Sequence, residues 1–189
     1  MTGKVEIFEW PAEPPMPAPG AVVLVRVRTG QARAVARHWV RAVLRRVLAR
    51  WSGLPEAQLP LTETGAGPLW TERLEGEPWG ISLAYAGGDG WIAVRRGGAV
   101  GLDALVAVDF PEWLAVARLY LGAATAGAIE SGPDPERAFA EAWTRHEARL
   151  KLHRLPLTEW PVTWPSAPVE ICHPAGPSGV VLALAVANH

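Results

Sequence analysis

The segment from Gln31 to Trp51 carries the pattern that most restricts how this chain can fold. Apolar residues recur there at every fourth position, with further apolar residues beside them. A period near four places side chains on one face of an α-helix, so the spacing predicts a helix with one buried face. Gly53 and Pro55 follow and end it. The predicted buried positions are Val35, Trp39, Val40, Val43, Leu44, Val47, Leu48 and Trp51.

Short apolar runs bounded by turn residues predict strands before and after this helix. Glycine-rich turns separate the runs in the middle of the chain, which indicates a meander, and the last two runs indicate a hairpin. The stretch from Pro60 to Pro78, with the breaker sequence TETGAGP, is predicted to be a loop. The predicted strands are Val22–Val27, Ile81–Tyr85, Trp91–Val94, Ala99–Leu105, Val169–Ile171 and Val180–Ala187.

Two more helices are predicted in the second half of the chain. The first covers Pro111–Leu121, with Asp109 as its cap, and the second covers Pro135–Arg154, with Asp134 as its cap. The buried side of the second helix is predicted to carry Phe139, Trp143 and Leu150.

The order of these elements predicts an α+β fold of two halves that meet near residue 100. The prolines of residues 1–20 exclude a regular helix or a central strand, so this segment is expected to be a flexible or extended arm. We therefore divide the chain into an arm (1–20), an N-terminal half (21–99) and a C-terminal half (100–189).

Composition and charge exclude several classes of function. The chain has 189 residues, 49% of them apolar, which argues against disorder throughout. The longest apolar run, Val180–Ala187, is far shorter than the roughly 20 residues of a membrane span, and the start lacks the features of a signal peptide. We therefore expect a cytoplasmic protein with no membrane partner. The net charge of −1 argues against a nucleic-acid partner, and the single cysteine, Cys172, excludes an internal disulfide.

Two clusters contain carboxylates that could carry chemistry. Asp103 ends an apolar strand in the sequence GLD, where the alternative is an ordinary turn or cap residue. Trp143, Glu147 and Lys151 lie one helical turn apart on one stripe of the predicted helix. The alternative here is a surface ion pair, but a large aromatic residue in the same stripe indicates a partly buried face that draws Glu147 toward a cleft.

A third cluster is a series of arginines at four-residue steps on the first helix. Such a stripe is either a solvated helix face or a surface that holds phosphates. Its members are Arg33, Arg37, Arg41 and Arg45, preceded by Arg26 and Arg28.

Taken together and in this order, these clusters resemble the 4′-phosphopantetheinyl transferase superfamily, in particular its two-halved, surfactin-synthetase-activating type. The sequences GLDAL at 101–105 and WTRHEARLK at 143–151 are similar to the family's signature pair. RAVLRRVLARW at 41–51, GAGPLW at 65–70, ISLAYAGG at 81–88 and VVLALAVA at 180–187 look like further family segments. The resemblance implies two similar α/β halves related by a pseudo-twofold axis in one chain, acting as a monomer.

The resemblance also implies an activity. Such an enzyme transfers the phosphopantetheine arm of coenzyme A to a serine of an apo carrier protein and releases adenosine 3′,5′-bisphosphate. Mg²⁺ would lie between two phosphates, with Asp103 and Glu147 as its side-chain ligands. The sequence does not decide between Mg²⁺ and Mn²⁺. Glu147, or a water on the metal, would take the serine proton, and Lys151 would hold the phosphate or protonate the leaving one.

Arg41, Arg45 and Tyr85 stand where the resemblance implies contacts to coenzyme A. A carrier protein's acidic recognition helix would land on exposed basic or apolar surface. Whether the carrier serves fatty acid, polyketide or nonribosomal peptide synthesis stays open.

Four departures from the family pattern support an alternative function. Leu105 replaces the third acidic ligand, Tyr85 a histidine, and Gly67 and His146 two lysines. These losses weaken the expected binding of metal and phosphates. The alternative is a degenerate member that binds coenzyme A or a carrier protein without catalysis. A third interpretation is an unrelated α+β binding domain.

Overall fold

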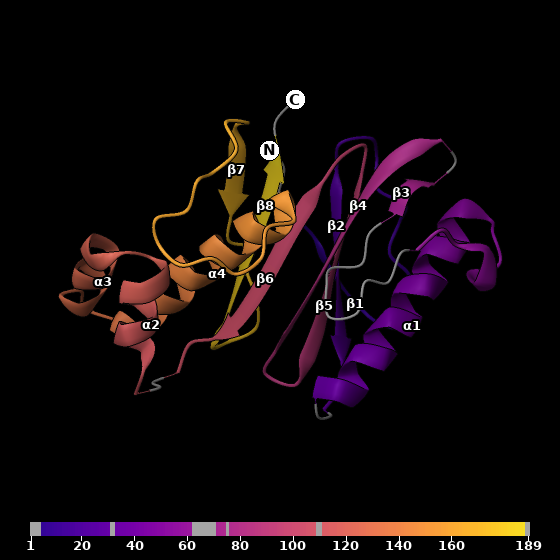
Figure 1. The fold of residues 1–189 in the computed structure, drawn as a ribbon. Coiled ribbons are helices and arrows are strands. Elements are labelled where there is room, and N and C mark those ends of the chain that lie inside the picture. Colours follow the sequence, from indigo (N-terminus) through magenta and orange to yellow (C-terminus); the bar gives the residue numbers. More distant parts are fainter. Residues whose placement is uncertain (1–4, 31–32, 62–70, 75, 109–110, 188–189) are drawn as a thin grey trace.

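The computed structural model describes residues 5–30, 33–61, 71–74, 76–108 and 111–187 (Figure 1). In these residues the chain forms two β-sheets and four α-helices, an arrangement compatible with an α+β fold. The five-stranded sheet has the order β1-β2-β5-β4-β3, and the three-stranded sheet has the order β6-β8-β7. The strands are β1 (Ile7–Glu9), β2 (Val22–Arg28), β3 (Thr71–Leu74), β4 (Glu77–Ala86), β5 (Asp89–Arg96), β6 (Val100–Val106), β7 (Val169–Cys172) and β8 (Val180–Ala187). The helices are α1 (Arg33–Ser52), α2 (Trp113–Tyr120), α3 (Ala123–Glu130) and α4 (Pro135–His153), with a short 3₁₀ turn at Glu56–Gln58.

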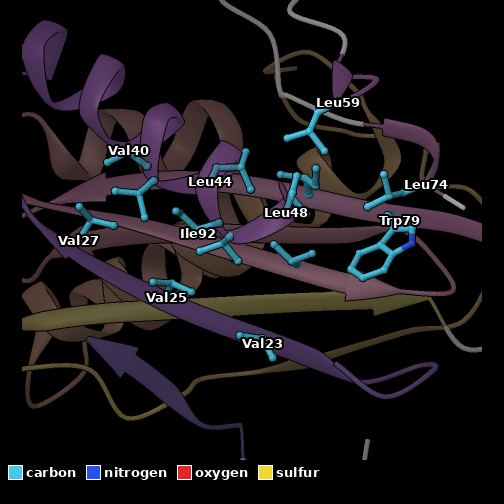
Figure 2. Packing of buried hydrophobic residues seen from close by; sticks show 14 residues of the cluster. Val23, Val25, Val27, Val40, Leu44, Leu48, Leu59, Leu74, Trp79 and Ile92 are labelled. Carbon is cyan, nitrogen blue, oxygen red and sulfur yellow. The ribbon is translucent and has the colours of Figure 1, made fainter. Parts of the chain in front are cut away.

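Helix α1 covers one face of the five-stranded sheet. Its buried side chains include Val40, Leu44 and Leu48, which belong to the same apolar cluster as Val25 and Ile92 of the sheet (Figure 2). Each fully buried Leu or Ile side chain contributes about 1.5–3 kcal/mol, so this layer holds α1 in place. The predicted helix is confirmed.

The other face of the five-stranded sheet packs against the three-stranded sheet. Leu24 and Trp91 share a buried cluster with Leu102 and Leu184. Because the two sheets bury these faces against each other, the sheets from the two parts of the chain share one core. Helix α4 covers the remaining face of the three-stranded sheet.

Strands β4 and β6 run side by side where the two sheets meet (Figure 1). The Leu102 backbone N–H donates to Ser82 Oγ at 2.9 Å, and both residues are buried. The Arg95 guanidinium, which is 7% exposed, donates to the carbonyls of Ala99 and Ala187, each at 3.0 Å. We call this contact between β4 and β6 the seam.

The strand predictions are confirmed in position, but the predicted meander is wrong at its last step. Strand β6 pairs with β8 and not with β5, because both edges of β5 are already occupied by β2 and β4. The prediction of a loop is also wrong at its end, since residues 71–74 and 77–78 belong to β3 and β4. Residues 62–70, which include TETGAGP, lie outside the described residues.

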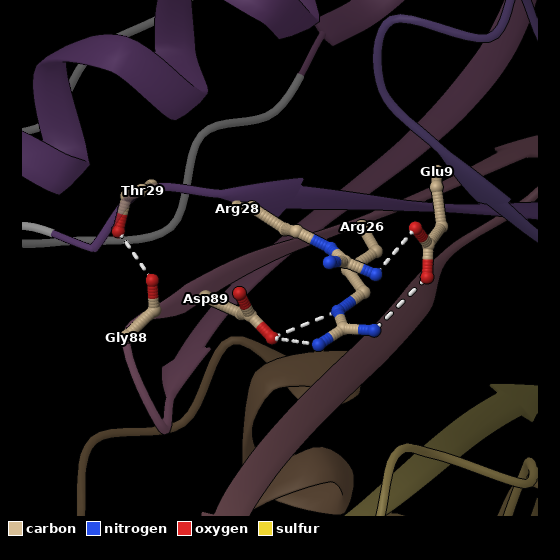
Figure 3. A network of polar contacts seen from close by, with 6 residues as sticks. All are labelled: Glu9, Arg26, Arg28, Thr29, Gly88 and Asp89. Atoms are coloured by element: carbon tan, nitrogen blue, oxygen red, sulfur yellow. Dashed lines mark hydrogen bonds and ion pairs between the residues drawn. The ribbon is translucent and has the colours of Figure 1, made fainter.

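The proline-rich arm is extended and packed against the body. Strand β1 pairs in parallel with β2 at the edge of the sheet, and the Trp51 indole N–H donates to the Pro14 carbonyl at 3.1 Å. Arg26 joins this edge to the next strand, because it binds Glu9 at 3.0 Å and Asp89 at 2.6 Å (Figure 3). Of the two expected states, flexible or extended, the described part of the arm shows the extended one, and its strand β1 is not a central strand.

Two apolar residues predicted to be buried on α1 are exposed. Val35 is 56% exposed and Trp39 is 42% exposed, and both line a shallow hollow near Thr29. Val40 lies over Gly90 at the end of the sheet, so the turn of α1 that precedes it projects past the last strand residues.

The helix predictions in the second half are confirmed with one addition. The Asp134 carboxylate caps α4 by accepting from the Arg137 N–H at 3.0 Å. Helix α2 begins at Trp113, and its predicted cap, Asp109, lies outside the described residues. Helix α3 was not predicted. None of the helices in the described parts of the chain is long and apolar enough to cross a membrane.

Candidate functional site

Strand β6 presents Asp103 to helix α4. Alternation along the strand turns Leu102 into the shared core, while Gly101 and Asp103 face α4. A Cβ atom at Gly101 would collide with the backbone carbonyl of Ala148, so the helix rests directly on the strand at this glycine. The absence of a side chain at Gly101 therefore brings α4 close enough to reach Asp103.

Helix α4 carries the predicted stripe of Trp143, Glu147 and Lys151. Trp143 stacks on Phe139 with ring centroids 5.9 Å apart and meets Tyr120 edge-on at 5.6 Å, which fixes the start of the stripe in the α2 and α3 layer. Glu147 is half-buried one turn further on. The stripe is partly buried, as predicted, and the cleft beside Glu147 stays a prediction.

Lys151 ends the stripe at the seam. Its Nζ donates to Asp103 Oδ1 at 2.7 Å, to the Leu102 carbonyl at 3.0 Å and to the Leu83 carbonyl at 3.3 Å. The ion pair is partly shielded, with the Lys151 side chain 25% and the Asp103 side chain 12% exposed. One ammonium thus connects β4, β6 and the last turn of α4.

The predicted coenzyme-binding residues lie in another layer. Arg41 and Arg45 are half-buried on α1, and Tyr85 packs at the rim of the cluster beneath that helix. The structure therefore directly joins Asp103 and Lys151, with Glu147 on the same stripe. It places Arg41, Arg45 and Tyr85 on the α1 side of β4.

Two of the departures have clear surroundings. Leu105 is on the same face of β6 as Asp103 and packs against the apolar cluster of α2, α3 and α4. Leu105 is half-buried, so an acidic residue there would enter a largely apolar environment. His146 is 8% exposed, and Gly67 lies outside the described residues.

Sequence reasoning missed a cluster on the next face of α4. Arg149 lies over the Trp164 ring at 4.2 Å from its centroid, and His146 and His153 meet the same ring at 5.6 and 6.4 Å. Burial lowers the pKa of both histidines, and the nearby Arg149 charge lowers it further. The only sequence signal for this cluster is the spacing of His146, Arg149 and His153, which places them on one face of the helix.

The carboxylates of β6 and of the α4 stripe are of the chemical type that a hard cation binds. Carboxylate oxygens are the ligands that Mg²⁺ prefers, and Asp103 and Glu147 supply one each. Among the described residues, no group of three or more His, Cys, Asp or Glu side chains could hold a metal ion. A metal here would therefore rely on two carboxylates, with Lys151 beside one of them.

Comparison with known proteins gives an informative match. No protein-family model matches the chain. A protein of Synechocystis sp. with the name "Putative 4′-phosphopantetheinyl transferase" is 30% identical over 115 residues, which are 59% of this chain and 46% of that protein. The match thus spans about half the length of the relative. This similarity supports a relationship to the 4′-phosphopantetheinyl transferase superfamily.

Proposed function

We propose that this protein transfers the phosphopantetheine arm of coenzyme A to a serine of an apo carrier protein. The observation that carries the proposal is the meeting of GLD on β6 with the Glu147–Lys151 stripe on α4, seen in the Asp103–Lys151 contact of 2.7 Å. The two segments are far apart in the chain and resemble the family's signature pair. The similarity to the Synechocystis protein supports the same activity.

The reaction assigns a separate role to each group. The carrier serine oxygen forms a bond to the phosphorus that carries the pantetheine arm, and the pyrophosphate bond breaks. Adenosine 3′,5′-bisphosphate leaves with the electron pair of that bond. Glu147 accepts the serine proton. Asp103 and Glu147 would hold Mg²⁺, which would neutralise phosphate charge when bound.

Helix α1 supplies positive charge for the coenzyme's phosphates in this proposal. It carries six arginines and no carboxylate. Arg46 and Arg50 pair with Glu56 and Glu13. We assign phosphate contacts to Arg41 and Arg45, with Tyr85 on the neighbouring strand as a hydrogen-bonding partner.

The proposal includes the organisation of the molecule. The two sheets, from residues 7–96 and 100–187, would correspond to the two halves of a pseudo-twofold fold that acts as a cytoplasmic monomer. The carrier would bring an acidic helix to the basic surface, because opposite charges steer such encounters.

Paired carboxylate variants test the proposal. Asp103→Asn and Glu147→Gln each remove one charge at nearly constant volume, and we expect each to reduce transfer by at least about 100-fold. Glu141→Gln is the matched control, because Glu141 is on the same helix and pairs with Arg137 at 2.9 Å. Transfer is measured by the mass of the carrier. Full activity of either seam variant would contradict the proposed roles.

The alternative function is binding without catalysis. It is favoured by the ammonium of Lys151 on Asp103 and by the apolar surroundings of Leu105. A protein that binds coenzyme A by calorimetry, yet modifies no carrier in the same buffer with Mg²⁺, would establish this alternative.

A further inference from the structure

We propose that Lys151 is a built-in counter-ion that competes with a divalent metal for Asp103, so that metal binding releases its ammonium from the seam. This inference rests on the proposed function, because it concerns the same metal site. It assigns Lys151 a positioning role before any phosphate is bound.

The first observation is that each of the three N–H groups of the Lys151 ammonium has an acceptor. A lysine ammonium has three N–H donors and no acceptor. The structure gives Nζ three acceptors: Asp103 Oδ1 at 2.7 Å and the carbonyls of Leu102 and Leu83 at 3.0 and 3.3 Å. In this arrangement the ammonium has no donor left for a phosphate oxygen.

The second observation is the place of the ammonium. It lies against the one carboxylate that β6 contributes, and the Asp103 side chain is only 12% exposed. A divalent cation bound to Asp103 needs an oxygen at roughly 2.0–2.1 Å and would repel a cation held at the same group. Lys151 and the metal therefore compete.

The surroundings make release of the ammonium feasible. Lys151 is in the last turn of α4, which ends two residues later at His153, and its side chain is 25% exposed. Its flexible four-carbon stem allows the ammonium to turn toward solvent without movement of the helix backbone. Once released, the ammonium regains donors for a phosphate.

Chemical labelling of the wild-type protein tests the release directly. The chain contains two lysines, Lys4 and Lys151, so their acetylation by acetic anhydride is separated by peptide mass. We expect Lys151 to react several-fold faster with saturating Mg²⁺ than without it, while Lys4 keeps one rate and serves as the internal reference. An unchanged or slower rate at Lys151 would overturn the inference.

Metal affinity gives a second, independent test. Mn²⁺ binding is measured by electron paramagnetic resonance for the wild type, Lys151→Met and the control Lys4→Met. We expect Lys151→Met to bind Mn²⁺ about tenfold more tightly, since its competitor is gone, and Lys4→Met to match the wild type. Equal or weaker binding by a folded Lys151→Met protein, or binding by neither protein, would overturn the inference. If Lys151→Met does not fold, the labelling of the wild type decides.

The two tests separate this inference from the proposed function. Metal binding with release of Lys151, but without modification of any carrier, would uphold the counter-ion and reject the transferase. Carrier modification with no change in Lys151 labelling would uphold the transferase and reject the counter-ion.

Discussion

At the scale of single residues, Gly101 decides how closely α4 approaches Asp103. A Cβ atom there would collide with the Ala148 carbonyl and press on the Leu152 backbone nitrogen. Both obstacles are main-chain atoms of a helix, which cannot turn aside as a flexible side chain can. The glycine in GLD is thus explained by packing and not by an unusual backbone angle.

Substitution of Gly101 is predicted to separate the strand from the helix. We expect Gly101→Ala to lower the free energy of unfolding by about 1–3 kcal/mol, the cost of overpacking a buried contact. Gly127→Ala in α3 is the control, because open space surrounds Gly127 and alanine favours a helix by up to about 1 kcal/mol. Urea unfolding of the three proteins measures both effects, and equal stability of Gly101→Ala and wild type would contradict this packing.

One contact between predicted site residues is present in the structure. Asp103, Glu147 and Lys151 were selected from spacing and residue type, and the structure joins Asp103 and Lys151. The backbone carbonyls of Leu83 and Leu102 also accept hydrogen bonds from Lys151. Every residue has such a carbonyl, so the sequence does not show which ones will accept. The surroundings of Leu105 could not be predicted, because its neighbours come from α2, α3 and α4, which are distant in sequence or were not predicted.

At the scale of elements, α4 is packed on several sides. Ala148 and Leu152 meet the sheet, the Trp143 side meets α2 and α3, and Trp164 covers the face with His146 and His153. The ring nitrogens Nε2 of both histidines are buried and have no hydrogen-bond partner among the residues that the structure describes. Protonation of either ring would therefore place a charge beside Arg149.

This packing predicts a loss of stability in mild acid. The pKa of both histidines is lower in the folded chain than the ordinary value of about 6.5, so the unfolded chain takes up protons first as the pH falls. The free energy of unfolding keeps the full contribution of the two histidines above pH 6.5. Below that pH it decreases by up to about 1.4 kcal/mol per pH unit for each histidine.

Thermal unfolding between pH 7.5 and 5.5 measures the effect. We expect His146→Gln to flatten the dependence and His38→Gln, at an exposed position on α1, to leave it as in the wild type. A wild-type midpoint that does not change over this range would contradict the prediction.

Secondary structure was predictable where the apolar period is regular. Helices α1 and α4 follow such periods, and six of the strands match predicted apolar runs. Strands β1 and β3 were not predicted. Helix α3 was missed because its sequence AATAGAIE has small residues and a glycine in place of a polar and apolar alternation. The exposure of Val35 and Trp39 depends on where the sheet ends beneath α1, which the period of the helix does not contain.

At the scale of the whole molecule, two sheets share a core and meet at a seam crossed by side chains of the five-stranded sheet and of α4. Arg95, Ser82 and Lys151 each connect the strands there through hydrogen bonds. Asp103 of β6 and Glu147 of α4 lie on one side of β4, and the arginines of α1 lie on the other. In our account, the transfer reaction takes place at this seam.

The most direct test is the modification of a carrier protein by the wild-type chain. Coenzyme A, Mg²⁺ and a panel of apo carrier proteins are incubated with it, and the intact mass of each carrier is recorded. We predict that at least one carrier gains one phosphopantetheine arm and that Asp103→Asn abolishes the gain. No gain in any carrier, from a folded protein that binds coenzyme A, would contradict the account.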